Sequence, residues 1–574
     1  MTLFEKTSSI KQVLVNLIRL MTRRYRILMI LVLVLTIGFS LVETVGISAI
    51  MPFISVVSNP KLLESGFYKT VFDFFGFTAP EIFIIVFGIV IIIFYLFRGV
   101  YSITLAYITK RYSMAMYTHF SKELFKINLS IPYKVYVQKN SAELMRSISG
   151  ETNEIGKVTF HLLNVCSEIF TILMIYAVIV YLNWKMTIII TGILLVFVVI
   201  ILSYLAKINS IQGKIKFTSG RNMNRALKES LGNLKYVKLK GNEDEILKTY
   251  NSALEKFNRS ELITHVLGAM PKSILESLGF SFLIGVVVFI VWLYKDASLV
   301  IPIISMYALA LYRILPSMHR MLQEINGILF SEETIKSVYD SMSQPVEEEG
   351  SDPLDFKNVI RLENISFNYM TGGEVISGVS LEIKKGEKIA ITGESGGGKS
   401  TLVDIIIGIH KPLSGKVFID NAIITDNNIR AWRKKIGYIP QSIYLFDGTV
   451  AENVAFGSAH DDEKIITALK KANIWGFLSS KDGIHTKVGD GGIQLSGGQQ
   501  QRIGIARALY DDPEVLVLDE ATSALDNETE QKIMDEIYSV SANKTLIVIA
   551  HRLTTVERCD RKMRIENGKI TRIQ

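Results

Sequence analysis

The sequence predicts an α-helical membrane domain with six spans, followed by an α/β domain that contains a phosphate-binding loop. Three observations support this order. Hydrophobic residues make up 49% of the 574 residues, a high share for a soluble protein, and they crowd the first half. Beyond them, short β-rich runs alternate with helical ones, as in an α/β domain. The stretch GESGGGKST, residues 393–401, lies between an apolar strand and an apolar helix.

Six apolar stretches are long enough to cross the hydrocarbon layer as helices, which takes about 20 residues. Lysine-rich polar stretches follow the second and the fourth, whereas the connections after the third and the fifth, NWK and YKDASL, are short. This charge bias predicts that both termini and the second half lie in the cytoplasm. The six stretches are residues 27–57, 82–108, 158–182, 186–206, 262–293 and 298–326.

Composition excludes several classes of protein. The two cysteines, Cys166 and Cys559, exclude a disulfide framework and a cysteine-based metal cluster. The net charge of +8 is compatible with nucleic acid binding, but no basic segment carries a recognition motif. We therefore expect no nucleic acid partner, and we attribute the charge to cytoplasmic loops and contact with membrane lipids.

The connection between the first two spans predicts an amphipathic helix over residues 59–76. Asn59 can cap it, Pro60 suits its first turn, and Gly76 suits its end, whereas Gly66 disfavours helix. Two interpretations remain open, a helix packed against the spans and an interfacial helix that touches lipid. The face predicted to be apolar consists of Leu63, Phe67, Val71 and Phe74 or Phe75.

Domain boundaries follow from a change in composition. Residues 336–356 are polar, acidic and contain proline, which is typical of a linker. The sequence therefore predicts a transmembrane domain over residues 1–335 and a nucleotide-binding domain over residues 357–574.

The glycine-rich loop predicts phosphate binding. Gly393 and Gly398 bracket four residues before Lys399 and Ser400, and small residues let backbone N–H groups and a helix N-terminus surround phosphate oxygens. Lys399 would reach the β- and γ-phosphates, and the Ser400 hydroxyl would bind Mg²⁺. The whole predicted phosphate-binding set is Gly393, Glu394, Ser395, Gly396, Gly397, Gly398, Lys399, Ser400 and Thr401.

An acidic pair and a second glycine motif complete the predicted site. Asp519 ends an apolar strand and would support Mg²⁺, and Glu520 would polarise the attacking water. Without the phosphate loop, such a pair would more often be a solvated turn. The motif LSGGQQQR places Ser496, Gly497, Gly498 and Gln499 at a predicted helix start, which is a second phosphate-binding geometry. One ATP does not need both motifs on one chain, so we expect two chains to face each other.

These motifs resemble those of ATP-binding-cassette (ABC) ATPases, and six spans before an ATPase domain resemble the ABC exporter half-transporters. The resemblance covers almost the whole chain. It implies a homodimer in a bacterial inner membrane, with ATP and Mg²⁺ as cofactors.

The resemblance also implies roles for single residues. Tyr369 would stack on adenine, although a buried strand tyrosine is the alternative. Gln441 would join the Mg²⁺ and water site to the membrane domain, and the loop at 486–492, TKVGDGG, would sense that domain. Asp526 would signal across the dimer, and His551 would contact the γ-phosphate. Glu520, His551 and Gln441 are thus the expected catalytic residues.

Cations in the spans point to the cargo. Arg98, Lys272 and Arg313 lie in apolar stretches, where ionisable side chains usually face the interior of the bundle. They form a candidate patch for an anionic headgroup. The alternatives are that the arginines extend to the inner interface, and that Lys272 pairs with Glu276.

The motifs LALYR, GESGGGKSTLVD, KIGYIPQSIYLF and TKVGDGG are similar to those of PglK-type flippases, although Lys272 stands where arginine is expected. This similarity implies transport of an undecaprenyl-pyrophosphate-linked oligosaccharide for protein N-glycosylation or related glycans. Flippases of lipid A or phospholipids, multidrug exporters and peptide exporters are the competing classes.

Overall fold

The computed structural model describes residues 15–58, 60–64, 66–294, 301–369, 373–519, 527–550 and 556–573. The chain divides into two compact units. Residues 1–129 and 139–344 form the membrane unit, and residues 130–138 and 345–574 form the nucleotide unit. The short segment 130–138 therefore packs with the second half of the chain, although it lies within the first half of the sequence.

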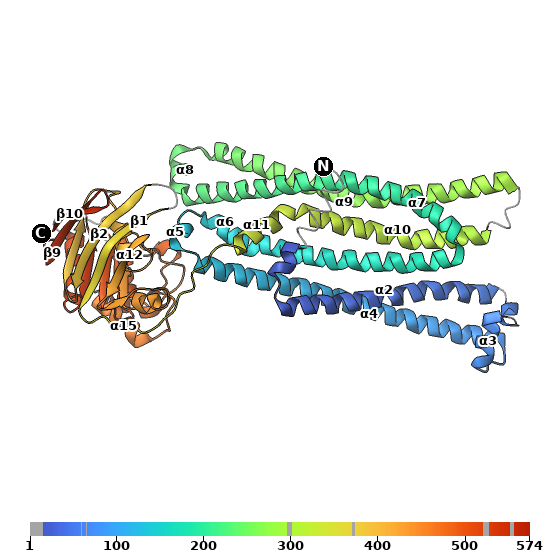
Figure 1. The fold of residues 1–574 in the computed structure, drawn as a ribbon, viewed down its shortest axis with the longest axis horizontal. Coiled ribbons are helices and arrows are strands. Elements are labelled where there is room, and N and C mark those ends of the chain that lie inside the picture. Colours follow the sequence, from blue (N-terminus) through green and yellow to red (C-terminus); the bar gives the residue numbers. More distant parts are fainter. Residues whose placement is uncertain are drawn as a thin grey trace. The chain divides into compact units, whose positions relative to one another are not determined.

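The membrane unit consists of long helices joined by short ones (Figure 1). Its long helices are α2 (Arg23–Ser58), α4 (Pro80–Ser130), α7 (Thr152–Gly232), α9 (Glu243–Tyr294) and α10 (Ile301–Phe330). The shorter ones are η1 (Pro60–Glu64), α3 (Gly66–Phe74), α6 (Ser141–Arg146), the π-helical turn η2 (Ser147–Glu151), α8 (Leu234–Lys240) and α11 (Glu332–Met342). Residues 336–342 of the predicted linker thus belong to helix α11.

Within the described residues, three helices are long and apolar enough to cross a membrane, Arg23–Val57, Pro80–Ser130 and Glu143–Ala177. They contain the first two predicted spans and residues 158–177 of the third. The other three predicted spans fall on α7, α9 and α10, except that residues 298–300 lie outside the described residues.

Helix α7 differs from the prediction because its 81 residues contain both the third and the fourth predicted span. The predicted connection NWK is helical instead of a loop. Arg221, near the end of α7, forms an ion pair with Glu143, which precedes its start. The segment therefore doubles back on itself (Figure 1).

The outer connection forms two helical pieces instead of one. It breaks before Gly66, whose φ of +64° suits glycine, and Asn59 lies outside the described residues. Leu63 is buried beside Val56 and Phe83, which agrees with a packed helix. Phe74 and Phe75 are 81% and 67% exposed, which agrees with the other interpretation, an interfacial helix that touches lipid. The side chain of Phe67 is outside the described part of the structure.

The nucleotide unit contains two sheets (Figure 1). A six-stranded sheet has the order β10-β9-β3-β8-β7-β6, in which β9, β3, β8, β7 and β6 are parallel neighbours and β10 is antiparallel. A four-stranded antiparallel sheet has the order β2-β1-β4-β5. The strands are β1 (Val359–Asn368), β2 (Glu374–Lys384), β3 (Lys388–Thr392), β4 (Ser414–Ile419), β5 (Ala422–Ile423), β6 (Ile436–Ile439), β7 (Val515–Asp519), β8 (Thr545–Ile549), β9 (Arg561–Glu566) and β10 (Lys569–Ile573).

Buried aliphatic strands explain why the parallel sheet forms. All five residues of β8 and the first four of β7 are buried, as expected where helices cover both faces of a sheet. The helices of this unit are α5 (Tyr133–Tyr136), α12 (Lys399–Ile406), α13 (Ile429–Arg433), α14 (Val450–Val454), α15 (Asp462–Lys471), α16 (Trp475–Ser479), η3 (Gly483–His485), η4 (Asp490–Gly492), α17 (Gly497–Leu509) and α18 (Asn527–Val540).

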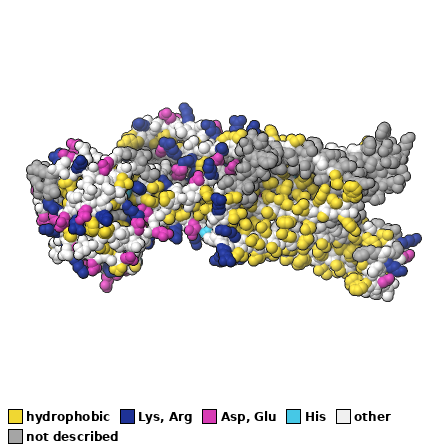
Figure 2. Space-filling view, in the orientation of Figure 1, with side chains coloured by type: hydrophobic (Ala, Val, Ile, Leu, Met, Phe, Trp, Pro, Cys, Tyr) yellow, Lys and Arg dark blue, Asp and Glu magenta, His cyan; other side chains and the backbone are white. Residues whose placement is uncertain are grey.

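The surface of the membrane unit carries exposed hydrophobic side chains. On α4 they run from Ile82 to Tyr107. On the face drawn in Figure 2, hydrophobic side chains form a broad area over this unit, and Lys and Arg side chains gather at one end of it. Such a surface suits contact with lipid chains, bordered by interfacial cations.

Candidate functional site

The phosphate-binding loop has the strand–loop–helix context that the sequence predicted. It begins after Thr392 of β3 and ends at the start of α12. Gly393 has φ of +139°, and a Cβ atom there would lie 2.1 Å from the carbonyl oxygen of Ile565. Gly398 has φ of +99°, and its Cβ would lie 2.8 Å from the Ile376 side chain. The loop therefore requires glycine at both ends, which keeps its backbone open to a phosphate chain.

Lys399 is held inside this loop. The side chain is only 5% exposed, and its ammonium donates hydrogen bonds to the carbonyl oxygens of Gly393 at 3.1 Å and Glu394 at 2.9 Å. No carboxylate pairs with it among the described residues. Because its partners are neutral carbonyls, the ammonium can exchange them for anionic phosphate oxygens.

A candidate Mg²⁺ site lies beside the loop. The Ser400 hydroxyl donates to Asp519 Oδ1 at 3.3 Å, and the Tyr438 hydroxyl donates to Asp519 Oδ2 at 3.0 Å. Hydroxyl and carboxylate oxygens are ligands that Mg²⁺ accepts together with phosphate oxygens, so these residues fit the ion. The sequence analysis missed Tyr438, although its place in the strand before Gln441 could have indicated it.

Three neighbouring parallel strands end at the same edge of the sheet. In the parallel register Ile439 lies opposite Leu518, and Asp519 lies opposite Ile549. Gln441 follows the first of these strands and is exposed. Glu520, Asp526 and His551 follow the other two strands but lie outside the described residues.

Tyr369 links the end of β1 to the phosphate loop. Its hydroxyl lies 3.2 Å from the Thr401 hydroxyl on α12. Its ring makes edge contacts with Phe367 at 5.2 Å and with His410 at 5.5 Å between ring centroids. The side chain is half-buried, so the predicted role in adenine stacking stays a proposal.

The second glycine motif begins a helix, as the sequence predicted. Ser496 is the N-cap of α17, and it forms a capping box with Gln499. Gln500 donates to the carbonyl oxygen of Gly492 at 2.9 Å and so ties this helix to the TKVGDGG loop. Because of this hydrogen bond, a displacement of the TKVGDGG loop would also shift the N-terminus of α17, where Ser496 lies.

The segment 130–138 forms a buried contact that the sequence analysis missed. The ring of Tyr133, on α5, lies 5.7 Å from the ring of His410. His410 is 3% exposed and stacks on Phe367 at 4.8 Å. A continuous chain of rings thus joins this segment to Tyr369.

Asp404 adds a titratable group to this contact. One carboxylate oxygen lies 3.9 Å from His410 Nε2. Burial, and next the carboxylate of Asp519, raise the pKa of Asp404 to about 7. Burial, and next the charge of Lys134, lower the pKa of His410, so this imidazole is neutral at pH 7.

In the membrane unit, one of the three predicted cargo cations has an anionic partner. Arg98 donates to Glu43 of α2 at 2.6 Å, so its charge is already compensated. Lys272 is exposed, and Arg313 lies on α10 with its side chain outside the described part. Nothing in the described structure brings these three cations together.

Acidic residues that the sequence analysis missed line the contact between α7 and α10. Arg320 donates to Glu168 Oε2 at 3.1 Å. Glu324 contacts His161 and accepts a hydrogen bond from Asn164 at 2.9 Å. The spacing of seven residues from His161 to Glu168 places these groups on one helix face. The contact between α7 and α10 therefore contains paired charges beside its apolar packing.

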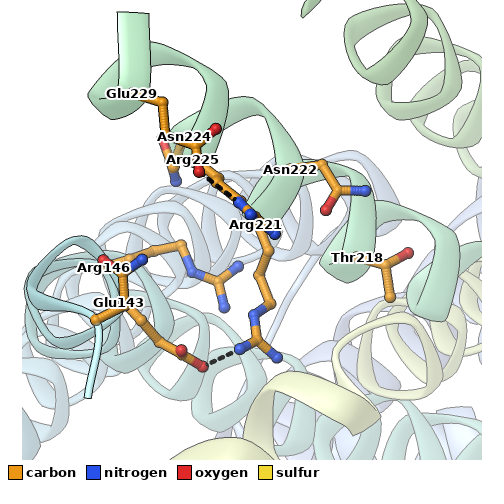
Figure 3. Close-up of a pocket in the computed structure, with 9 residues that line it drawn as sticks. Glu143, Arg146, Thr218, Arg221, Asn222, Asn224, Arg225 and Glu229 are labelled. Atoms are coloured by element: carbon orange, nitrogen blue, oxygen red, sulfur yellow. Dashed lines mark hydrogen bonds and ion pairs between the residues drawn. The ribbon is translucent and has the colours of Figure 1, made fainter. Parts of the chain in front are cut away.

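A polar cavity of 440 Å³ lies between α6 and the end of α7 (Figure 3). Arg146 and Arg221 extend toward one another in it, and Arg221 pairs with Glu143. Arg146 pairs with Glu151, and Arg225 pairs with Glu229. Because its arginines are paired, the cavity presents hydrogen-bonding groups more than net charge.

Together, the phosphate loop, the acidic strand end and the long helices define an ATP-driven membrane transporter. The family described as ABC transporter matches residues 376–523, and the ABC transporter transmembrane region matches residues 26–315. The chain belongs to the ABC transporter family, as an exporter half-transporter that hydrolyses ATP.

Similar proteins agree with this family. The chain is 30% identical to the ATP-dependent lipid A-core flippase of Burkholderia pseudomallei (strain 1710b), over 78% of this chain and 76% of that protein. It is 31% identical to the protein of the same name in Saccharophagus degradans, over 79% and 78%. The structure of a bacterial Atm1-family ABC exporter with ATP bound has the same fold, with a TM-score of 0.75, 22% identity and coverage of 96% and 95%.

Proposed function

We propose that two copies of this chain form an ATP-driven flippase that moves a lipid with a large polar headgroup across a bacterial inner membrane. The observation that carries this proposal is the set of paired polar groups between α7 and α10, together with the hydrophobic exterior of α4. Ionisable groups are costly in a bilayer and usually mark a polar pathway. An amphiphilic cargo suits a bundle with both kinds of surface.

The residues of the nucleotide unit support a role for ATP in driving this movement. The loop amides and Lys399 would bind the phosphates, and Ser400, Asp519 and Gln441 would hold Mg²⁺, which neutralises phosphate charge when bound. Glu520 would orient the attacking water, and His551 would contact the γ-phosphate. Ser496 of the partner subunit would close the site, so that binding draws two nucleotide units together and hydrolysis releases them.

The relatives favour a lipid A-type or phospholipid cargo over the polyprenyl-linked oligosaccharide that the motif similarity implied. Their names describe lipid A-core flippases. The segment 130–138 would transmit the motion, because its Tyr133 contacts the ring chain that ends at Tyr369. The charge bias of the loops predicts that the ATPase half lies on the cytoplasmic side of the membrane.

Reconstituted transport tests the proposal. Proteoliposomes would contain fluorescent lipid A, a fluorescent phospholipid or a polyprenyl-pyrophosphate oligosaccharide, and accessibility of each lipid would be followed after ATP addition. We expect ATP-dependent flipping of lipid A or the phospholipid, and none with Lys399→Ala. Flipping of the polyprenyl lipid alone would replace the proposed cargo. ATP hydrolysis that moves none of the three would contradict the flippase proposal.

A further inference from the structure

A cavity of 400 Å³ lies within the membrane unit, between α2, α4 and α7. This volume is in the range of small-molecule pockets, about 300–1,000 Å³. One wall comes from Thr36 and Phe39 of α2, and another comes from residues 102–110 of α4. The third wall comes from residues 160–167 of α7. The cavity thus lies inside a single chain, apart from the nucleotide site.

The depth of this cavity follows from how α2 and α4 pair. The Tyr112 hydroxyl donates to the carbonyl oxygen of Tyr25, and the Tyr101 hydroxyl donates to that of Leu35. The two helices therefore run antiparallel, so that Lys110 is level with the basic start of α2. Eight residues separate Ser102 from Lys110, which is about 12 Å of helix. The cavity extends by that distance from the interface toward the middle of the bilayer.

Lys110 marks the interfacial end of the cavity. The closely spaced exposed apolar side chains of α4 reach Tyr107, and Lys110 is the first basic residue after it. Its ammonium lies 5.6 Å from the centre of the Phe160 ring. Arg98 and Arg320 both have carboxylate partners, but no carboxylate pairs with Lys110 within the described residues.

The walls combine apolar and polar groups. Phe39, Leu105 and Leu163 supply apolar surface. The hydroxyl groups of Ser102 and Thr109 lie on the α4 side. Such a site offers one positive charge at the interface, the Thr109 hydroxyl beside it, and mixed apolar and hydroxyl surface deeper in the cavity. A phospholipid has matching groups, with an anionic phosphate at the interface and glycerol and acyl chains beyond it.

We propose that this cavity binds an anionic phospholipid from the membrane leaflet at the basic start of α2. The phosphate pairs with Lys110, and the glycerol and the first chain carbons occupy the space above it. Basic pockets between membrane helices on the cytoplasmic side bind anionic headgroups in this way. The inference does not depend on the transported cargo, because a bound lipid can also be a resident component of the protein.

Native mass spectrometry of the full-length protein tests the inference. The protein is titrated with dioleoyl phosphatidylglycerol, and zwitterionic dioleoyl phosphatidylcholine is the comparison lipid. Lys110→Gln should weaken phosphatidylglycerol binding about fivefold, the effect of one basic residue near a membrane surface. Arg111→Gln is the matched control, because Arg111 is the exposed neighbour and does not line the cavity.

A second variant tests the cavity itself. Ala106→Phe fills the space with an aromatic ring and keeps every charge, so it should weaken binding of both lipids. Unchanged binding in both Lys110→Gln and Ala106→Phe would overturn the proposal. An equal loss in Lys110→Gln and Arg111→Gln would also overturn it, because the effect would then be a general property of interfacial charge. As a folding control, each variant should unfold at the same temperature as the wild-type protein.

Discussion

Lys399 in the nucleotide unit and Arg98 in the membrane unit are both partly or fully buried cations, but they have different partners. Lys399 donates to two backbone carbonyl oxygens, whereas Arg98 donates to the carboxylate of Glu43. A neutral carbonyl leaves most of a positive charge uncompensated, and a carboxylate cancels it. The first cation is ready for an anionic ligand, and the second already has its anion.

This difference separates a binding charge from a structural one. Phosphate can displace carbonyl contacts at Lys399 with a net gain, because a charge-assisted bond replaces a weaker one. At Arg98 a headgroup must compete with an ion pair that is formed within the same chain.

Glu520→Gln should have the largest effect. It removes the expected base but keeps the size of the side chain, so steady-state ATP hydrolysis should fall by about 10²–10⁴-fold while ATP still binds. Phosphate release at saturating ATP measures the first effect, and nucleotide retention measures the second. Near-normal turnover would mean that another residue is the base.

Breaking the Glu43–Arg98 pair should reduce stability more than transport. Removing one partner of a partly buried ion pair leaves the other uncompensated, and Arg98→Gln or Glu43→Gln should each lower the free energy of unfolding by about 2–3 kcal/mol. The double variant should recover part of this loss. Thermal unfolding in detergent checks all three. If Arg98→Gln abolishes flipping while Glu43→Gln does not, and all proteins are equally stable, Arg98 binds the headgroup after all.

The two units also differ in how far the sequence could predict them. The phosphate loop is continuous in sequence, and its glycine positions follow from local backbone geometry, so Gly393, Gly398 and Lys399 could be placed in advance. Asp519 could also be placed, because parallel strands end at one edge of a sheet. The partner of Arg98 lies 55 residues away on another helix. Helical periodicity does not tell which faces meet, and Glu43 was therefore missed.

The contact of His410 with Tyr133 was unpredictable for the same reason. Tyr133 lies in the first half of the chain, and only the packing of residues 130–138 with the second half brings it to His410. The continuous helix across NWK was missed because these residues were interpreted as a short connection between two spans, whereas the backbone there stays helical.

Asp404→Asn should change how stability depends on pH. The raised pKa of Asp404 means that the folded state binds one more proton than the unfolded state between about pH 4 and pH 7. The free energy of unfolding therefore falls as pH rises through this window. The asparagine side chain does not ionise, so this decrease in the free energy of unfolding is absent from the variant. The variant should therefore be more stable than the wild type by about 2 kcal/mol at pH 8 and similar to it at pH 4. Thermal unfolding in EDTA without nucleotide measures both. A constant difference at all pH values would contradict the assignment.

His410→Ala should have a smaller effect, on coupling. It removes the ring between Tyr133 and Phe367, so stimulation of ATPase activity by transported lipid should fall about fivefold, with basal activity within about twofold of the wild type. His410→Phe keeps a ring and serves as the control. Equal loss of basal and stimulated activity would show that His410 only supports folding.

The central claim is that a working ATP site contains Lys399 of one chain and Ser496 of the partner subunit. Co-expression of a Lys399→Ala chain with a Ser496→Arg chain, each with its own affinity tag, gives mixed dimers that are isolated by two purification steps. In a dimer of Lys399→Ala alone or Ser496→Arg alone, both sites are damaged. The mixed dimer keeps one site with both groups intact, so it should hydrolyse ATP at up to about half the wild-type rate. ATPase activity no higher than that of the two parent dimers, with dimer assembly confirmed, would contradict the claim.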